Sequence, residues 1–398
     1  MRLKVALLND SFPPTIDGVA NTTLNYARIL TRHHNCESVV VTPKYPGVVD
    51  NYPFEVYRYH SVRTPQKIGY RAGDPINPFA IKQLRQMQCD LVHVHCPFVS
   101  ALLGNEMVVG RRRRAPVIFT YHTKFGIDID NRFKGEAFRA IAKKFVLQNI
   151  YRSDEVWVVS KGAGRDLREL GYEGGMRVME NGTDFPRVTL TRDQLDAFHH
   201  EHNLTGDHLV LLFVGRMMWY KNIRLILDGL RIAKNTGLRF SMYFVGDGYD
   251  LPAIERYTQQ IGLSGCVYFT GKISDREKLK IYFGRSNLFL FPSTYDTSGL
   301  VVKEAAACSC PSLLVAGSCA AEGVMDNDTG LLAEESAESC AQRILAALRE
   351  PGTLARIGRG AADRVYLSWD DAVAMAYKRY EEIIGSWPHP LPNLHKDW

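Results

Sequence analysis

Two carboxylates separated by seven residues stand in a segment that could bind a phosphorylated sugar. The apolar run 288–291 ends in Pro-Ser-Thr, a pattern typical of a buried strand that enters a turn. Asp296 then lies in the predicted loop, and Glu304 lies about two turns into a predicted helix. A helix N-terminus binds phosphate because unpaired N–H groups and the helix dipole act together, whereas a carboxylate further along the helix can reach a sugar hydroxyl. The N–H groups predicted to be available for phosphate are those of Ser298, Gly299 and Leu300.

The segment 295–311 resembles the E-x7-E motif of the retaining glycosyltransferases of family 4. Further pieces match in the family's order along the chain, at 17–20, 181–184, 215–216 with Lys221, 246–248 and 267–271. The resemblance covers nearly the whole chain and implies the GT-B architecture, in which two Rossmann-like domains with parallel sheets face each other across a cleft. Asp296 departs from the family pattern, which prefers glutamate there. Because aspartate is one methylene shorter, the transferred sugar must sit differently or a water must intervene.

The resemblance implies a role for two cations that follow the predicted strand 209–214. It implies that Arg216 and Lys221, next to Gly215, bind the donor diphosphate and neutralise the leaving group. This suits the chemistry, because a departing diphosphate gains negative charge that nearby cations stabilise. Alternatively, both are exposed basic residues at the start of a helix. Cations are disfavoured at that end of a helix, so we prefer the diphosphate interpretation.

The resemblance also implies which groups hold the two sugars of the donor. Glu304 is expected to accept hydrogen bonds from the nucleotide ribose, and Asp296 from hydroxyls near C3 of the transferred sugar. His122 ends a predicted strand where the family often has a histidine that faces the donor sugar, although such a histidine can also be structural. Gly18 resembles the glycine that lets the backbone approach acceptor and diphosphate. Alternatively, it only forms the turn at the start of a helix.

Three other patterns could suggest a metal or redox site, and we assign no such role to them. Asp128 and Asp130 form D-x-D, the metal–nucleotide motif of the other major glycosyltransferase fold, but they stand in a chain of GT-B pattern. His93 and His95 lack a third zinc ligand at a fitting spacing. The cysteines at 308 and 310 have no supporting base. We therefore expect no metal and no cofactor, with the nucleotide sugar as co-substrate.

The composition is that of a globular protein with two domains. The chain has 398 residues, of which 45% are hydrophobic and 23% charged, and this is long enough for two separate cores. No apolar run approaches the roughly 20 residues of a membrane-spanning helix. The first ten residues predict a strand rather than a signal peptide. Because the eight cysteines include no C-x-x-C pair, we expect reduced thiols in a cytoplasmic protein.

Apolar runs alternate with helical patterns along most of the chain, which predicts α/β domains with parallel sheets covered on both faces. The absence of G-x-G-x-x-G argues against an NAD or FAD site. We predict a Rossmann-like acceptor-binding domain over 1–185, a polar helical connection over 186–207, and a Rossmann-like nucleotide-sugar-binding domain over 208–370. The resemblance implies that the last helix, about 371–398 with its tail, joins the first domain.

The excess of positive charge lies in the first half of the chain. Residues 1–185 hold 26 basic and 18 acidic residues, against 23 and 25 in the remainder. The basic residues include the run 111–114 and the predicted helix 132–152. In that helix the apolar residues near helical spacing are Phe133, Phe138, Ile141, Phe145 and Ile150. Such a helix can lie on an anionic membrane surface, or it can bury its apolar face on its own sheet. We prefer the second interpretation and leave peripheral membrane attachment open.

These observations predict a retaining glycosyltransferase that moves a hexose from a nucleotide sugar, expected to be UDP-linked, to a glycan or lipid-linked acceptor. No side chain is an obvious nucleophile, so we expect front-face displacement assisted by the leaving phosphate. One alternative is a nucleotide-sugar epimerase of the same fold, which would need no acceptor. The other is a non-catalytic nucleotide-sugar-binding protein, which the departure at Asp296 leaves open. No nucleic-acid partner is expected.

Overall fold

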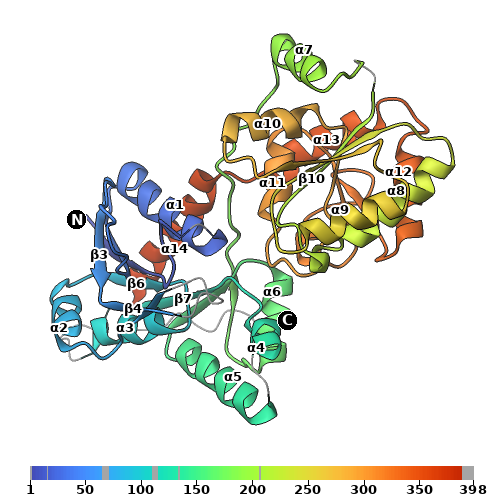
Figure 1. Ribbon diagram of the computed structural model, residues 1–398. Helices are drawn as coiled ribbons and strands as arrows, with labels where there is room; N and C mark the ends of the chain where they lie inside the picture. Colours follow the sequence, from blue (N-terminus) through green and yellow to red (C-terminus); the bar gives the residue numbers. More distant parts are fainter. Residues whose placement is uncertain are drawn as a thin grey trace. The chain divides into compact units, whose positions relative to one another are not determined.

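The computed structural model describes residues 2–15, 17–64, 71–109, 115–132, 135–205 and 208–387. The chain forms two compact units, of which the first comprises Met1–Asn181 with Trp369–Trp398 and the second Gly182–Ser368 (Figure 1). Each unit has its own parallel sheet, as the alternation of apolar runs and helical patterns predicted.

The first unit contains a seven-stranded sheet in the order β3-β2-β1-β6-β7-β8-β9, in which every neighbouring pair is parallel. The central strands are buried on both faces, because helices cover both sides, and so they appear in the sequence as continuous apolar runs. A separate antiparallel pair is formed by β4 (Ser61–Arg63) and β5 (Arg71–Gly73). The strands of the large sheet are β1 (Lys4–Leu8), β2 (Glu37–Pro43), β3 (Glu55–Tyr59), β6 (Leu91–Val94), β7 (Val117–Tyr121), β8 (Glu155–Val158) and β9 (Arg177–Val178).

The helices of the first unit begin at residues suited to that position. The Asp17 carboxylate accepts from two N–H groups in the first turn of α1 (Gly18–His33). The Ser160 hydroxyl accepts from Ala163 N in the first turn of α6 (Lys161–Leu170). The C-terminal helix α14 (Trp369–Ser386) packs against α1, and Arg379 on α14 forms a 2.6 Å ion pair with Glu155 on β8. The remaining helices are α2 (Pro78–Gln86), α3 (Val99–Val108), α4 (Phe125–Arg132) and α5 (Glu136–Tyr151).

The second unit contains a six-stranded parallel sheet in the order β12-β11-β10-β13-β14-β15. Strand β10 lies at the point where the strand order reverses, and ligands bind outside the carboxyl ends of the strands at such a point. The strands are β10 (Val210–Val214), β11 (Ser241–Val245), β12 (Val267–Gly271), β13 (Leu288–Leu290), β14 (Ser312–Val315) and β15 (Leu331–Ala333).

Residues 186–207, predicted as a connection between domains, belong to the second unit. Helix α7 (Arg192–Glu201) packs against α10 (Arg276–Arg285), where Arg285 Nε donates to His199 Nε2 at 2.6 Å. Phe198 on α7 is buried in the core of that unit, so the segment is more than a polar linker. The other helices are η1 (Trp219–Lys221), α8 (Ile223–Asn235), α9 (Leu251–Gln260), α11 (Leu300–Ala307), η2 (Cys319–Ala321), α12 (Ala337–Ala347) and α13 (Thr353–Arg364).

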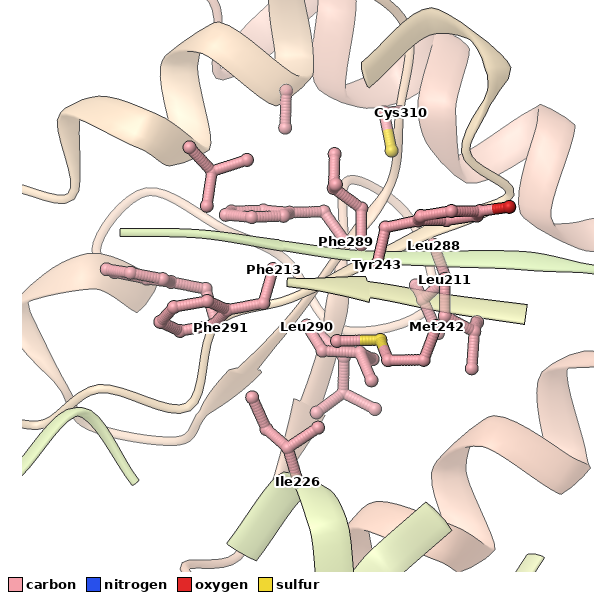
Figure 2. Packing of buried hydrophobic residues seen from close by; sticks show 14 of the residues in the cluster. Leu211, Phe213, Ile226, Met242, Tyr243, Leu288, Phe289, Leu290, Phe291 and Cys310 are labelled. Atoms are coloured by element: carbon pink, nitrogen blue, oxygen red, sulfur yellow. The ribbon is translucent and has the colours of Figure 1, made fainter. Parts of the chain in front are cut away.

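The core of the second unit packs aromatic side chains around strands β10 and β13. Figure 2 shows Phe213, Phe289 and Phe291 among them, with the ring centroids of Phe213 and Phe291 6.0 Å apart. Phe213 lies one residue before the end of β10, and Phe291 directly follows β13. The loops that follow the two strands carry the candidate site.

Candidate active site

Two residues predicted to contact different parts of a donor are hydrogen-bonded to each other at the carboxyl end of the second sheet. Lys221 ends η1 after β10, and Asp296 lies in the loop after β13. Because β10 and β13 are parallel neighbours, their C-terminal loops meet at one edge of the sheet. The Lys221 ammonium donates to Asp296 Oδ1 at 2.5 Å, and the lysine side chain is only 7% exposed.

Aromatic rings surround the Lys221 ammonium. Its Nζ lies 5.7 to 6.0 Å from the ring centroids of Tyr220, Phe291 and Tyr295. Burial lowers the pKa of Lys221, and the Asp296 carboxylate opposes that effect. The second oxygen of Asp296 is buried and finds no hydrogen-bond partner in the described residues. It could therefore accept a hydrogen bond from a ligand hydroxyl.

Arg216 lies beside this pair in the loop after Gly215. Its guanidinium is exposed and forms no ion pair or hydrogen bond with the residues that the structure describes. The neighbouring backbone is fixed, because Met217 N donates to Asp247 O at 3.0 Å and a Cβ on Gly246 would lie 1.9 Å from Gly215 O. A rigid loop that presents a cation without a protein counter-ion suits an anionic ligand.

The start of α11 lies beside the same edge. Gly299 adopts a left-handed conformation, with φ of 54°, and a Cβ there would lie 2.9 Å from the Ala320 Cα, so glycine is required. Within the described part of the chain, no acceptor is found for the N–H groups of Ser298, Gly299 and Leu300. The predicted phosphate-binding donors are therefore unpaired at a helix N-terminus.

Glu304 projects from α11 and pairs with a residue that the sequence analysis missed. Arg276 Nη2 lies 2.7 Å from Glu304 Oε1 and also pairs with Asp184. The Glu304 side chain is only 12% exposed, and burial raises its pKa against the lowering effect of Arg276. The only sequence signal for Arg276 is a cation at the first position of a helix, where the dipole disfavours it.

The remaining predicted site residues lie in the first unit. His122 follows β7, and its Nε2 lies 3.0 Å from Nδ1 of His95, which follows β6. Burial lowers the pKa of His122 to about 3, so its imidazole is neutral at physiological pH. A Cβ on Gly18, the first residue of α1, would meet nothing within 4 Å, so packing within the unit does not require a glycine there.

The sequence analysis assigned no metal or redox role to the D-x-D aspartates, the histidine pair or the cysteines at 308 and 310. The structure shows the surroundings of several of these side chains. Asp130 pairs with Lys143 at 2.8 Å, whereas the side chain of Asp128 lies outside the described residues. His93 makes 2.6 Å hydrogen bonds to the Tyr380 and Thr120 hydroxyls. Burial raises the pKa of the Cys308 thiol to about 12. No group of three or more metal-binding side chains is found among the described residues.

The apolar side chains of α5 are not all buried on the sheet of their own unit, although the sequence analysis preferred that interpretation. Phe138, Ile141 and Phe145 are 67%, 65% and 40% exposed, so the expectation that these side chains are buried on their own sheet was wrong. Ile150 of the same predicted apolar set is buried, together with Val146 and Asn149, whereas Phe133 lies outside the described residues. We call Phe138, Ile141 and Phe145 the α5 ridge. The basic residues Arg139, Lys143 and Lys144 lie on the same helix, whereas the run 111–114 lies outside the described residues.

Within the described part of the chain, no helix is both long and apolar enough to cross a bilayer.

Two family models match the chain. The model for Glycosyltransferase Family 4 matches residues 16–187, and that for Glycosyl transferases group 1 matches residues 195–364. Together they cover both units.

Curated relatives include the alpha-monoglucosyldiacylglycerol synthase of Streptococcus pneumoniae, 23% identical over 78% of this chain and 70% of that protein. The GDP-mannose-dependent alpha-mannosyltransferase of Corynebacterium glutamicum is 22% identical over 96% of this chain and 89% of that protein. One relative is named for a glucosylated lipid and the other for a GDP-mannose donor, so similarity alone does not select a donor.

Solved structures share the fold. Sucrose-phosphate synthase from Thermosynechococcus elongatus matches with a TM-score of 0.74 and 22% identity, over 97% of this chain and 100% of that one. Anabaena HepE in complex with UDP matches with a TM-score of 0.76 and 16% identity, over 96% and 100% of the two chains. The predicted GT-B fold is confirmed.

Proposed function

Because this chain belongs to the retaining glycosyltransferases of family 4, which take a sugar from a nucleotide sugar, we propose that it transfers a hexose from a UDP-sugar to a lipid-borne acceptor. The observation that carries the choice of acceptor is the exposed α5 ridge on a helix with three basic residues. The first unit would bind the acceptor and the second the donor.

The donor part of the proposal is supported by the positions of charge in the second unit. The cations Arg216 and Lys221 and the unpaired N–H groups at the start of α11 would hold the diphosphate. Asp296 would use its free buried oxygen to accept from a hydroxyl of the hexose. Glu304 would accept from the ribose.

We expect the reaction to be a front-face displacement, because no side chain is an obvious nucleophile. The bond between the anomeric carbon and the phosphate oxygen breaks, and a bond from the acceptor oxygen forms on the same face of the sugar. The acceptor hydroxyl gives its proton to an oxygen of the departing phosphate. Arg216 and Lys221 stabilise the negative charge that the diphosphate gains, so most of the catalytic effect is electrostatic.

The acceptor part of the proposal is supported by the chemistry of α5. Three apolar side chains in successive turns of one helix lose contact with water if they enter the interfacial region of a bilayer, and nearby cations attract anionic lipids. The family-4 relatives include proteins named for glucosyldiacylglycerol and phosphatidylinositol mannoside products, and a lipid acceptor is consistent with them.

The test is a transfer assay with UDP-, GDP- and ADP-hexoses and vesicles that contain an anionic lipid with diacylglycerol or phosphatidylinositol. We expect free UDP and a glycosylated lipid to form together, measured by nucleotide release and mass spectrometry of the lipid fraction. Nucleotide release that yields only free hexose, by transfer to water, in every mixture would contradict the lipid acceptor. Conversion of the donor hexose to its epimer without any acceptor would instead support the epimerase.

A further inference from the structure

Arg276 lies between two carboxylates of the second unit, although neither of them is close to it in sequence. Its Nη2 pairs with Asp184, 92 residues before it, and with Glu304, 28 residues after it. The helix that begins at Arg276 is already capped by the carboxylate of Asp275. A cation at this end of a helix opposes the dipole, so α10 itself gains nothing from Arg276.

The guanidinium is held in place by an aromatic ring. Its Cζ lies 4.2 Å from the ring centroid of Phe185, close enough for a cation–π interaction. Arg276 is therefore fixed by Phe185 and Asp184 as well as by Glu304. The contact fixes only one oxygen of Glu304, because Oε2 has no partner among the residues that the structure describes.

We propose that Arg276 is a positioning residue for nucleotide recognition, which keeps Glu304 as a carboxylate with Oε2 left to accept from the vicinal hydroxyls of a ribose. This inference rests on the proposed function, since it takes Glu304 as the ribose-binding group. A carboxylate offers only acceptors and so matches two hydroxyl donors, whereas the protonated acid presents a donor of its own. The consequence would be preference for ribonucleotides over deoxyribonucleotides.

The surroundings of Glu304 show why it needs Arg276. Burial raises its pKa, and the nearby Asp184 carboxylate acts in the same direction. Arg276 is the cation that lowers it. The Cys308 thiol at the end of α11 is also near, but burial raises its pKa to about 12, so it stays neutral. Without Arg276, the pKa of Glu304 would rise further and the carboxyl group would bind a proton at a higher pH.

The experiment is calorimetric titration with UDP, 2′-deoxy-UDP and 3′-deoxy-UDP at pH 6.5 and 8.5. The proteins compared are wild type, Arg276→Gln, Arg276→Lys and Glu304→Gln. Lys278→Gln is the matched control, because Lys278 lies on the same helix but pairs with Glu201. Thermal melting of each variant reports on folding. If Arg276→Gln fails to fold, Arg276→Lys gives the answer, since lysine keeps the charge but lacks the planar guanidinium that packs over the Phe185 ring.

We expect wild type and Lys278→Gln to prefer UDP over each deoxy form by about tenfold or more, the effect of a hydrogen bond to a charged group. In Arg276→Gln the preference should fall to within about threefold at pH 6.5 and recover in part at pH 8.5, as Glu304 ionises. Arg276→Lys should be intermediate, and Glu304→Gln should lack the pH-dependent recovery.

Two results would overturn the inference in different ways. If Arg276→Gln, or Arg276→Lys where the first variant does not fold, keeps the wild-type preference at both pH values, the role of Arg276 is refuted while nucleotide binding stands. If wild type binds none of the three nucleotides, the UDP-sugar proposal fails and this inference fails with it.

Discussion

The Lys221 ammonium and the Asp296 carboxylate form a 2.5 Å hydrogen bond across 75 residues of sequence. The family resemblance assigns the first residue to the diphosphate and the second to the transferred sugar. In the structure they are one ion pair, so the protonation of the lysine depends on the carboxylate. A donor that binds both groups would meet a prearranged pair of opposite charges rather than two independent side chains.

Replacement of Asp296 by asparagine should make activity more sensitive to alkaline pH. Burial already lowers the pKa of Lys221, and Asp296 opposes that effect, so the variant should lower this pKa further. Because the charged lysine is the form that stabilises the diphosphate, activity should be lost at a lower pH than in wild type. We also expect kcat/KM to fall about tenfold at neutral pH, for one lost charged hydrogen bond. The measurement is the pH profile of kcat/KM.

Glu335→Gln is the control for that profile, because Glu335 bonds to Asn222 and Thr294 near the same loop without contacting Lys221. Its alkaline limb should match wild type. An Asp296→Asn profile that coincides with wild type would show that the ion pair does not set the charge of Lys221.

Arg216→Ala should lower turnover more than donor affinity. The negative charge on the diphosphate grows as the bond to the sugar breaks, so a nearby cation stabilises the transition state more than the bound donor. We expect kcat to fall about a hundredfold, as for other lost electrostatic contacts to a developing anion, while affinity for the donor changes much less. Steady-state kinetics with calorimetric binding separates the two quantities.

Arg224→Ala is the matched variant, since Arg224 is a nearby cation that packs over the rings of Trp219 and Tyr257. It should leave kcat close to wild type. Equal losses of turnover and affinity in Arg216→Ala would contradict the assigned role.

The sequence alone predicted the elements whose signals are local. Strand β10 appears as an apolar run because both faces of a parallel sheet are buried. Gly18 was interpreted as the turn at the start of a helix, and α1 begins at that residue. The position of Gly299 followed from the strand–loop–helix pattern, and its left-handed φ agrees with the choice of glycine.

The sequence did not predict contacts between distant residues. The partners of Arg276 lie 92 and 28 positions away, so no spacing rule connects them. The contact of His122 with His95 depends on β6 and β7 being neighbours in the sheet. The α5 ridge could not be placed because an amphipathic pattern does not say whether its apolar side chains face a sheet or solvent.

Activity should persist when divalent cations are removed. Arg216, the Lys221 ammonium and the unpaired N–H groups at the start of α11 already offer positive charge and donors where the diphosphate would lie, so we expect that no metal is needed for charge neutralisation. The measurement is the transfer rate after dialysis against EDTA, compared with the rate after Mg²⁺ or Mn²⁺ is restored. Loss of activity in EDTA, with recovery on adding either ion, would contradict this and revive the interpretation of Asp128 and Asp130 as metal ligands.

The α5 ridge should bind anionic membranes. Each exposed apolar side chain that becomes buried contributes up to about 1.5–3 kcal/mol, and each cation near an anionic surface about 1 kcal/mol. In sedimentation with liposomes, wild type should bind anionic vesicles more strongly than neutral ones, and high salt should weaken that binding. The triple variant Phe138→Ser, Ile141→Ser, Phe145→Ser should lose binding to both kinds of vesicle. The double variant Lys143→Glu, Lys144→Glu should lose only the preference for anionic lipid.

Phe79→Ser is the control for these variants, because Phe79 is an 80% exposed aromatic residue on α2 of the same unit but outside the ridge. It should sediment like wild type. Because the ridge side chains are exposed, the triple variant should also melt close to the wild-type temperature, which separates lost membrane binding from lost folding. Equal and negligible sedimentation of wild type with anionic and neutral vesicles would refute the membrane role of α5, and the acceptor would then be sought among soluble glycans.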